Sequence, residues 1–239
     1  MNAIKRGIMT IAILLCNFIL YGQDSKSYYI LGLDRYIQGA YSMAIKDFDR
    51  AIELDPYSDD AYCYRGSAKQ KLKIYSMAIK DLDKAIELDP YNWRNYSFRA
   101  SYKSEQKDYT GAILDYSKAI DLDSNQWSNY YFRGFEKAKL KDHRGAILDY
   151  SKAIRLNPKK ENVYIARGYS KHNLKDYGGA ILDFNKAIGL NPNNGDAYNG
   201  RGLSKISLNQ KESGCVDLSK AGELGETRAY EFIQELCNN

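Results

Sequence analysis

A short segment recurs along the chain at a fixed interval of 34 residues. It reads AIELDP at residues 51–56 and 85–90, and related segments follow at 119–124, 153–158 and 187–192, with a weaker copy from residue 221. Upstream, a tyrosine followed four residues later by glycine or alanine keeps the same interval, as in Tyr130 and Gly134. A fixed period of this length indicates a repeat architecture, in which each unit buries its apolar face by stacking on its neighbours.

Each unit is predicted to form two helices. Tyr130 and Gly134 are spaced as one helical face requires, and the first helix should stop at the Lys-Leu-Lys-Asp turn of residues 139–142. In the second helix, Ala146 and Tyr150 belong to an apolar stripe of the same period, which Pro158 closes. The repeating element is therefore a helix-turn-helix hairpin.

These aromatic, small and proline positions resemble the tetratricopeptide (TPR) repeat. The resemblance implies an all-α, right-handed superhelical solenoid. Ser124 replaces the closing proline of the third unit, and the sixth has Gly214 for alanine and Glu226 for proline, as expected of an atypical terminal repeat. We expect a TPR domain at residues 23–239, with repeats at 25–58, 59–92, 93–126, 127–160, 161–194 and 195–228 and a capping helix at 229–239.

The first 22 residues differ from all that follow. Lys5 and Arg6 form a basic start, and an apolar run extends from Ile8 to Tyr21, too short for a membrane span. This pattern predicts a signal peptide at residues 1–22, cleaved before Gln23; Cys16 as a lipid-attachment site is the alternative. The leader and the cysteine-containing last unit resemble exported TPR proteins of Bacteroidetes-type bacteria. We expect export to the periplasm or cell envelope of a Gram-negative bacterium, or secretion.

Composition and motifs argue against nucleic-acid binding and against catalysis. The net charge of +5 arises from 35 basic and 30 acidic residues that are mixed along the chain, which is no nucleic-acid signature. The chain has no phosphate-binding glycine loop and no HExxH, and the repeat geometry places no nucleophile beside His143 or His172. We therefore expect no catalytic, cofactor or metal site.

A charged pair repeats with the framework. Arginine replaces the usual apolar residue of the first helix in five units, and an aspartate follows sixteen residues later, as in Arg133 and Asp149. Folding of the hairpin brings the two together, although the aspartate could instead reach the next unit's arginine. The arginines could also hold phosphates or carboxylates. A structural network is favoured because every arginine has a partner within the chain. The arginines are Arg65, Arg99, Arg133, Arg167 and Arg201, and the aspartates are Asp81, Asp115, Asp149, Asp183 and Asp217.

The cysteines are too few and too scattered for a zinc cluster. Cys215 and Cys237 are almost equidistant from a bend near residues 225–226, so we expect a disulfide between them, which an exported compartment permits. Two ordinary buried cysteines are the alternative. Cys63 should stay free.

In TPR proteins the first helices line the concave surface, so the resemblance implies a protein-binding site on their varied face. Aromatic anchors there would suit a polypeptide ligand, although some of the tyrosines could instead pack between adjacent first helices. Tyr29 and Leu33 stand where a chaperone-tail clamp needs lysine and asparagine, so that clamp is not expected. The candidate residues are Tyr29, Tyr36, Gln70, Ser101, Tyr131, Phe135, Tyr169, His172 and Asn199.

The sequence therefore predicts a non-enzymatic scaffold that binds a peptide segment or helix of an envelope protein. The alternatives are a glycan- or peptidoglycan-binding module and an accessory domain that supports a separate enzyme. The first repeat also presents an apolar helix, with Ile30, Leu31 and Leu33, and no helix is expected to cap it. Self-association or a partner would cover this edge.

Overall fold

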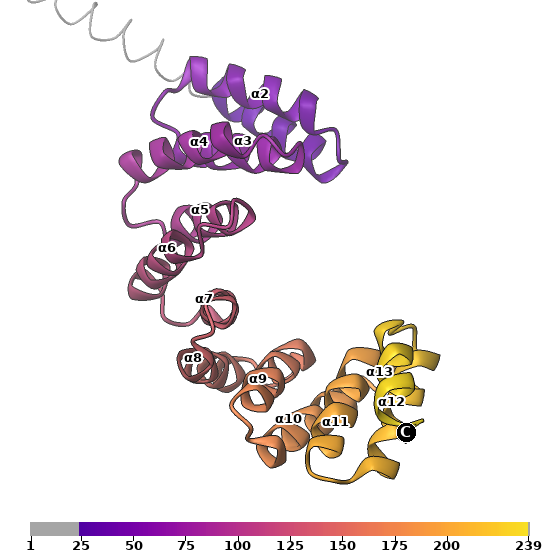
Figure 1. The fold of residues 1–239 in the computed structure, drawn as a ribbon. Coiled ribbons are helices and arrows are strands. Elements are labelled where there is room, and N and C mark those ends of the chain that lie inside the picture. Colours follow the sequence, from indigo (N-terminus) through magenta and orange to yellow (C-terminus); the bar gives the residue numbers. More distant parts are fainter. Residues whose placement is uncertain (1–23, 239) are drawn as a thin grey trace, which may run out of the picture. The chain divides into compact units, whose positions relative to one another are not determined.

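The computed structural model describes residues 24–238, and these form two compact units that meet in sequence after Leu122. The predicted signal peptide lies outside the described residues. In unit 1, the helix at residues 24–37 precedes α2, and two further hairpins follow (Figure 1). Their helices are α2 (Tyr41–Leu54), α3 (Asp59–Lys71), α4 (Tyr75–Leu88), α5 (Trp93–Glu105) and α6 (Tyr109–Leu122).

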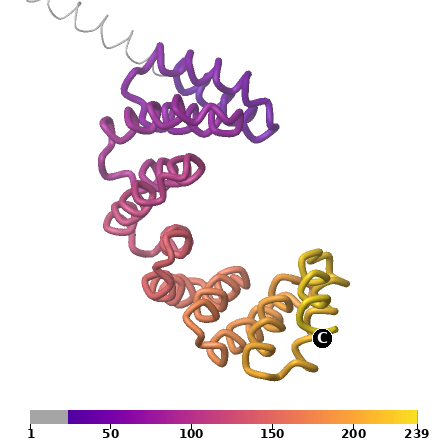
Figure 2. The backbone as a smooth tube through the Cα atoms, in the orientation of Figure 1, coloured from indigo at the N-terminus to yellow at the C-terminus, as the bar shows by residue number. Residues whose placement is uncertain are grey.

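Unit 2 contains three hairpins and a last single helix, and Figure 2 shows the same path as a backbone tube. Its helices are α7 (Trp127–Lys139), α8 (His143–Leu156), α9 (Glu161–Asn173), α10 (Tyr177–Leu190), α11 (Gly195–Ser207), α12 (Lys211–Glu223) and α13 (Arg228–Leu236). The first helices from α3 onward begin at residues 59, 93, 127, 161 and 195, where the expected repeats begin. Over the described residues the predicted all-α fold is confirmed, and no strand occurs.

Each hairpin turns at a residue with positive φ. In the fourth repeat Lys141 has φ 64°, its N–H donates to the Ala138 carbonyl at 2.9 Å, and Asp142 then caps α8 by accepting from the Gly145 N–H at 2.9 Å. Such a cap satisfies a donor that the helix itself leaves unpaired. The turn residues from the second repeat onward are Lys73, Lys107, Lys141, Lys175 and Asn209.

Close contact between the two helices of a hairpin requires small residues. A Cβ at Gly134 would lie 2.8 Å from Cε1 of Tyr150 and 3.2 Å from the Ala146 carbonyl, so only glycine fits without a shift. Tyr150 is 1% exposed, and large apolar residues occupy the same place in the other second helices: Phe48, Leu82, Tyr116, Phe184 and Leu218. These side chains form the core along the repeats.

The repeated arginine grips the aspartate of its own hairpin. Arg133 donates from Nε and Nη2 to the two oxygens of Asp149, at 2.9 and 2.6 Å, and Lys137 Nζ lies 2.8 Å from the same carboxylate. Asp149 is 4% exposed. The aspartate therefore pairs with the arginine of its own hairpin and not with that of the next repeat. The arginine and the lysine together satisfy both carboxylate oxygens.

A third arginine nitrogen, Nη1, reaches back to the preceding repeat within each unit. In unit 1 the partners are carboxylates: Arg65 contacts Asp49 at 2.7 Å, and Arg99 contacts Asp83 at 2.8 Å. In unit 2 the partners are neutral: Arg167 donates to Ser151 at 3.0 Å, and Arg201 to Asn185 at 2.7 Å. One side chain therefore holds its own hairpin closed and links it to the preceding one.

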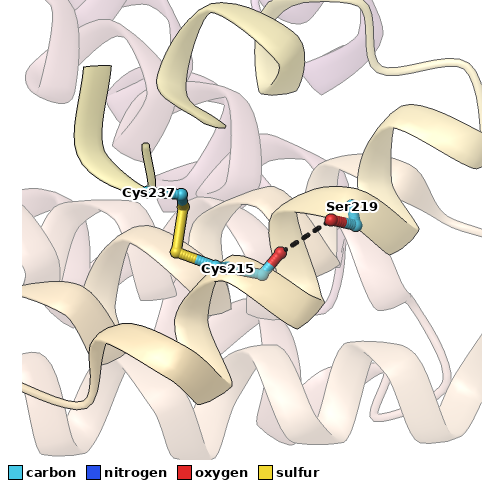
Figure 3. The surroundings of a disulfide bond; sticks show 3 residues. All are labelled: Cys215, Ser219 and Cys237. Atoms are coloured by element: carbon cyan, nitrogen blue, oxygen red, sulfur yellow. Dashed lines mark hydrogen bonds between the residues drawn. A yellow bond between two sulfur atoms is a disulfide. The ribbon is translucent and has the colours of Figure 1, made fainter. Parts of the chain in front are cut away.

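A disulfide attaches α13 to the last repeat. It joins Cys215 of α12 to Cys237, whose Cα atoms lie 5.9 Å apart, while the Ser219 hydroxyl donates to the Cys215 carbonyl (Figure 3). Ala229 is fully buried against this end of the unit. Cys63 is a free, buried cysteine, and burial raises the pKa of its thiol far above its usual range.

Candidate functional site

We use the term inner face for the side of the first helices on which the sequence placed its candidate binding residues. In unit 1 aromatic rings fill it. Tyr64 lies between Tyr29 and Tyr36, with ring centroids 5.9 and 6.3 Å away, and its ring stacks on Phe48 at 6.3 Å. Burial raises the pKa of both Tyr29 and Tyr36. These two candidates are thus packing residues, the alternative that the sequence left open.

The other two candidates of unit 1 lie on α3 and α5. Gln70 and Ser101 are each half-buried, and the Ser101 hydroxyl donates to the Phe98 carbonyl of its own helix at 2.8 Å. Beside them, the Tyr102 hydroxyl donates to Ser67 at 2.9 Å and so joins α5 to α3. The inner face of unit 1 is therefore largely committed to contacts within the protein.

In unit 2 the inner face is hollowed between α7 and α9. Tyr131 and Phe135 stack with centroids 6.4 Å apart, and Phe135, which is 42% exposed, forms one wall of a cavity of about 290 Å³. Lys139 places its Nζ 4.6 Å from the centre of the Phe135 ring. The cavity is lined by Phe135, Ala138, Lys139, His143, Tyr150, Ala166, Tyr169, Ser170 and Asn173. Its walls are mainly apolar, with cationic and amide groups among them.

A second cavity, of about 590 Å³, lies between α9, α11 and α13. Tyr169 belongs to the walls of both cavities, and its hydroxyl donates to Oδ1 of Asp196 at 2.5 Å. Burial, together with the Asp196 carboxylate, raises the pKa of Tyr169 well above its usual range. The second cavity is lined by Tyr169, Asp196, Asn199, Leu203, Glu226, Arg228 and Phe232.

Two candidates of unit 2 lie deeper than the sequence predicted. Asn199 is only 7% exposed, and its Nδ2 donates to the Tyr169 hydroxyl at 3.4 Å. His172 is half-buried, with Nδ1 2.9 Å from the Ser204 hydroxyl and its ring against Tyr177, and burial lowers its pKa. The expectation that no serine would lie beside His172 is therefore wrong, although the Ser204 hydroxyl itself donates to the Gly200 carbonyl at 2.8 Å. Both stay candidates for the binding face, and Asn199 also lines the second cavity. They join α9 to its neighbours because adjacent first helices cover that edge of the face.

Several residues of the hollowed face were missed from the sequence. Phe232 and Arg228 of α13 line the second cavity, and Ala166 and Asn173 of α9 line the first. The apolar side chains within residues 228–236 could have indicated this role, but the sequence analysis interpreted the segment only as a capping helix.

The described residues offer no group of three or more His, Cys, Asp or Glu side chains that could hold a metal ion. Within the same range, no helix is both long enough and apolar enough to cross a bilayer.

Sequence models described as Tetratricopeptide repeat match residues 59–92, 128–160 and 161–194, and one described as TPR repeat matches residues 32–73. Together these segments cover more than half of the chain. Among curated proteins, none matches the sequence.

Solved structures share the fold at low sequence identity. PilF of Pseudomonas aeruginosa aligns over 90% of this chain and 99% of its own, with 20% identity and a TM-score of 0.78. YrrB, described as a TPR protein with an unusual peptide-binding site, aligns over 78% and 97%, with 20% identity and a TM-score of 0.68. MamA aligns over 72% and 94%, with 23% identity and a TM-score of 0.66. At these identities the likeness concerns the fold alone.

Proposed function

Because the chain belongs to the tetratricopeptide repeat family, we propose that it is a non-enzymatic scaffold that binds a peptide segment or helix of another protein. The binding site is the inner face of unit 2. The observation that carries this proposal is Tyr169, whose side chain separates two cavities that open beside exposed Phe135 and near Phe232. Two adjacent hollows suit successive side chains of one polypeptide.

The chemistry of the face favours a polypeptide over the two alternatives. A sugar ligand needs free polar groups around exposed rings, whereas the Tyr169 hydroxyl already donates to Asp196. The framework arginines are held by their own aspartates, so they do not form a stripe that grips phosphates or carboxylates. An accessory role beside a separate enzyme is compatible with the same face, and the enzyme would then be the bound partner.

The test is capture of a partner from cell-envelope extract, followed by measurement of its affinity. The bait is the chain from residue 23, which contains every described helix, beside a triple variant Tyr131→Ala, Phe135→Ala, Tyr169→Ala. A matched control, Leu148→Ala with Leu182→Ala, removes exposed apolar side chains from the second helices instead. Loss of the partner with the triple variant alone, while circular dichroism stays helical, supports the proposal. A partner retained by the triple variant and lost from the control moves the site to the second helices.

We also propose that the protein is exported and cleaved before Gln23. The basic start and apolar run of residues 1–22 support this, as does a disulfide, since such bonds persist in oxidising compartments. Mass spectrometry of the protein from fractionated cells tests both points: a mature protein that starts at Gln23 is expected, and a lipid on Cys16 or an intact cytosolic chain contradicts the proposal.

Self-association through the first repeat is a separate proposal. Ile30 and Leu31 are 55% and 40% exposed on the helix of residues 24–37, and Ile37 at its end is 82% exposed. Light scattering at rising concentration should show a dimer that Ile30→Ser with Leu31→Ser weakens. A protein that stays monomeric at high concentration excludes it.

A further inference from the structure

The larger cavity of unit 2 holds a hydrogen-bond chain with a fixed direction. The Asn199 amide donates from Nδ2 to the Tyr169 oxygen, and the single Tyr169 hydroxyl proton is directed to Asp196. This leaves Oδ1 of Asn199 buried in the wall with no hydrogen-bond partner. A buried acceptor without a partner costs free energy, and a donor brought by a ligand would remove that cost.

The charges around the cavity are unbalanced. Asp196 and Glu226 both line the cavity, and Asp196 Oδ1 accepts the hydrogen bond of the Tyr169 hydroxyl. Glu226 forms no ion pair with any described residue, and neither does Arg228, whose guanidinium lies 6.0 Å from the centre of the Phe232 ring. Two carboxylates thus face one cation, and the lining carries a net negative charge.

The remaining walls are apolar. Phe232 and the Tyr169 ring provide aromatic surface, and Leu203 provides an aliphatic wall. A long cationic side chain fits this combination, because its methylene stem packs on apolar surface while its head group pairs with carboxylates or lies over a ring. An acidic side chain would instead meet two carboxylates and an unpartnered oxygen.

We propose that the cavity between α9, α11 and α13 receives a lysine or arginine side chain of the bound polypeptide. Asp196 and Glu226 pair with its cationic head, and Tyr169 and Phe232 enclose its stem. This inference rests on the proposed function, since it names the chemistry of the partner for the same face. Arg228 opposes the incoming charge and sets an upper limit on the affinity.

The test uses a random peptide library displayed on phage and selected against the chain from residue 23. The selected peptides should carry lysine or arginine at one recurring position. A synthetic copy of the best peptide should lose about tenfold in affinity when that residue becomes norleucine, which keeps the stem and removes the charge.

Variants of the protein separate charge from fold. Asp196→Asn with Glu226→Gln keeps an acceptor for Tyr169 and should also lose about tenfold in affinity, while Arg228→Gln should bind the same peptide more tightly. Glu231→Gln, an exposed carboxylate of α13 outside the lining, is the matched control and should bind as the parent does. Melting temperatures verify that all the variants fold.

The outcomes distinguish the two proposals. Selected peptides without a recurring basic residue, whose binding Phe135→Ala abolishes, would overturn this inference and leave the proposed function intact. Tighter binding by Asp196→Asn with Glu226→Gln would also overturn it. A library from which nothing binds above background would count against both.

Discussion

Units 1 and 2 share one framework and differ in how the inner face is filled. At the same place in successive first helices, unit 1 carries the rings of Tyr64 and Phe98, whereas unit 2 carries Phe132 and then Ala166 and Gly200. Tyr64 fills the face of unit 1 through edge-to-face contacts with Tyr29 and Tyr36, while Ala166 lines a cavity. A small residue in place of a ring at this position, as at Ala166, therefore leaves a cavity on the inner face while the framework of the repeat stays unchanged.

Removing one buried carboxylate from each unit tests whether the two units depend equally on the arginine–aspartate pairs. Asp115→Ala and Asp149→Ala each leave an arginine and a lysine without their shared partner. Each variant should lose about 3–5 kcal/mol of unfolding free energy, because an uncompensated charge stays at a buried site. Urea denaturation checks both. A loss confined to one unit would show that the two frameworks are not equivalent.

Removing the disulfide tests whether the second cavity depends on the covalent bond that attaches α13 to α12. Cys215→Ser should cost about 2–4 kcal/mol, since the bond constrains the unfolded chain between residues 215 and 237. Unit 1 contributes only the free Cys63 among its described residues, so reduction should lower the stability of unit 2 alone. Hydrogen exchange with and without reductant measures this. Equal deprotection of α13 and α3 would contradict it.

Removing the ring of Tyr64 from unit 1 and adding a ring at Ala166 of unit 2 tests most directly whether this position decides if the inner face is filled or hollow. Tyr64→Ala should open the face of unit 1 and cost about 2–3 kcal/mol, because it removes a ring from a packed cluster. Ala166→Phe should fill the smaller cavity of unit 2, change stability by less than about 1 kcal/mol, and abolish partner binding. Calorimetry gives the stabilities and a binding assay gives the affinity. Unchanged affinity of Ala166→Phe would remove that cavity from the site.

The smallest expected effect concerns pH. Burial lowers the pKa of His172 below its ordinary value of 6.5, so the unfolded chain takes up a proton more readily than the folded protein does. The stability that the neutral, buried His172 contributes is fully present above about pH 6.5, and it is lost as the pH falls through the lowered pKa of the folded state. Melting of the parent and of His172→Gln at about pH 7.5 and about pH 5.5 tests it. The parent should lose more than the variant, and equal losses would contradict the assignment.

Much of the framework could be predicted from the sequence, because each framework residue contacts residues that lie within 34 positions of it in the chain. The helix starts, the turn before Asp142 and the existence of an arginine–aspartate pairing in the repeats can be read from spacing alone. The choice of Arg133 over the next repeat's arginine as the partner of Asp149, and the use of Nη1 for the preceding repeat, could not, because the aspartate is at a similar sequence distance from both arginines.

The inner face was predicted less well. Asn199 was placed on it, yet this residue is only 7% exposed, whereas Phe132, beside the candidate Tyr131, is 42% exposed. A helix turns about 100° per residue, so the edge that a neighbouring first helix covers depends on how the two helices cross. No single hairpin encodes that crossing. The second cavity depends in addition on α13, which lies outside the repeat pattern.

The arginine clamps have a consequence for how such a chain can change its length. The fifth repeat, for example, contains Arg167, its own Asp183, and Asn185, which Nη1 of the next arginine contacts. A gene duplication of one whole segment inside a unit would therefore supply every bonding partner that the new segment and its successor need. An insertion inside a hairpin would change the sixteen-residue spacing between the arginine and its aspartate, so the paired residues favour growth in whole repeats.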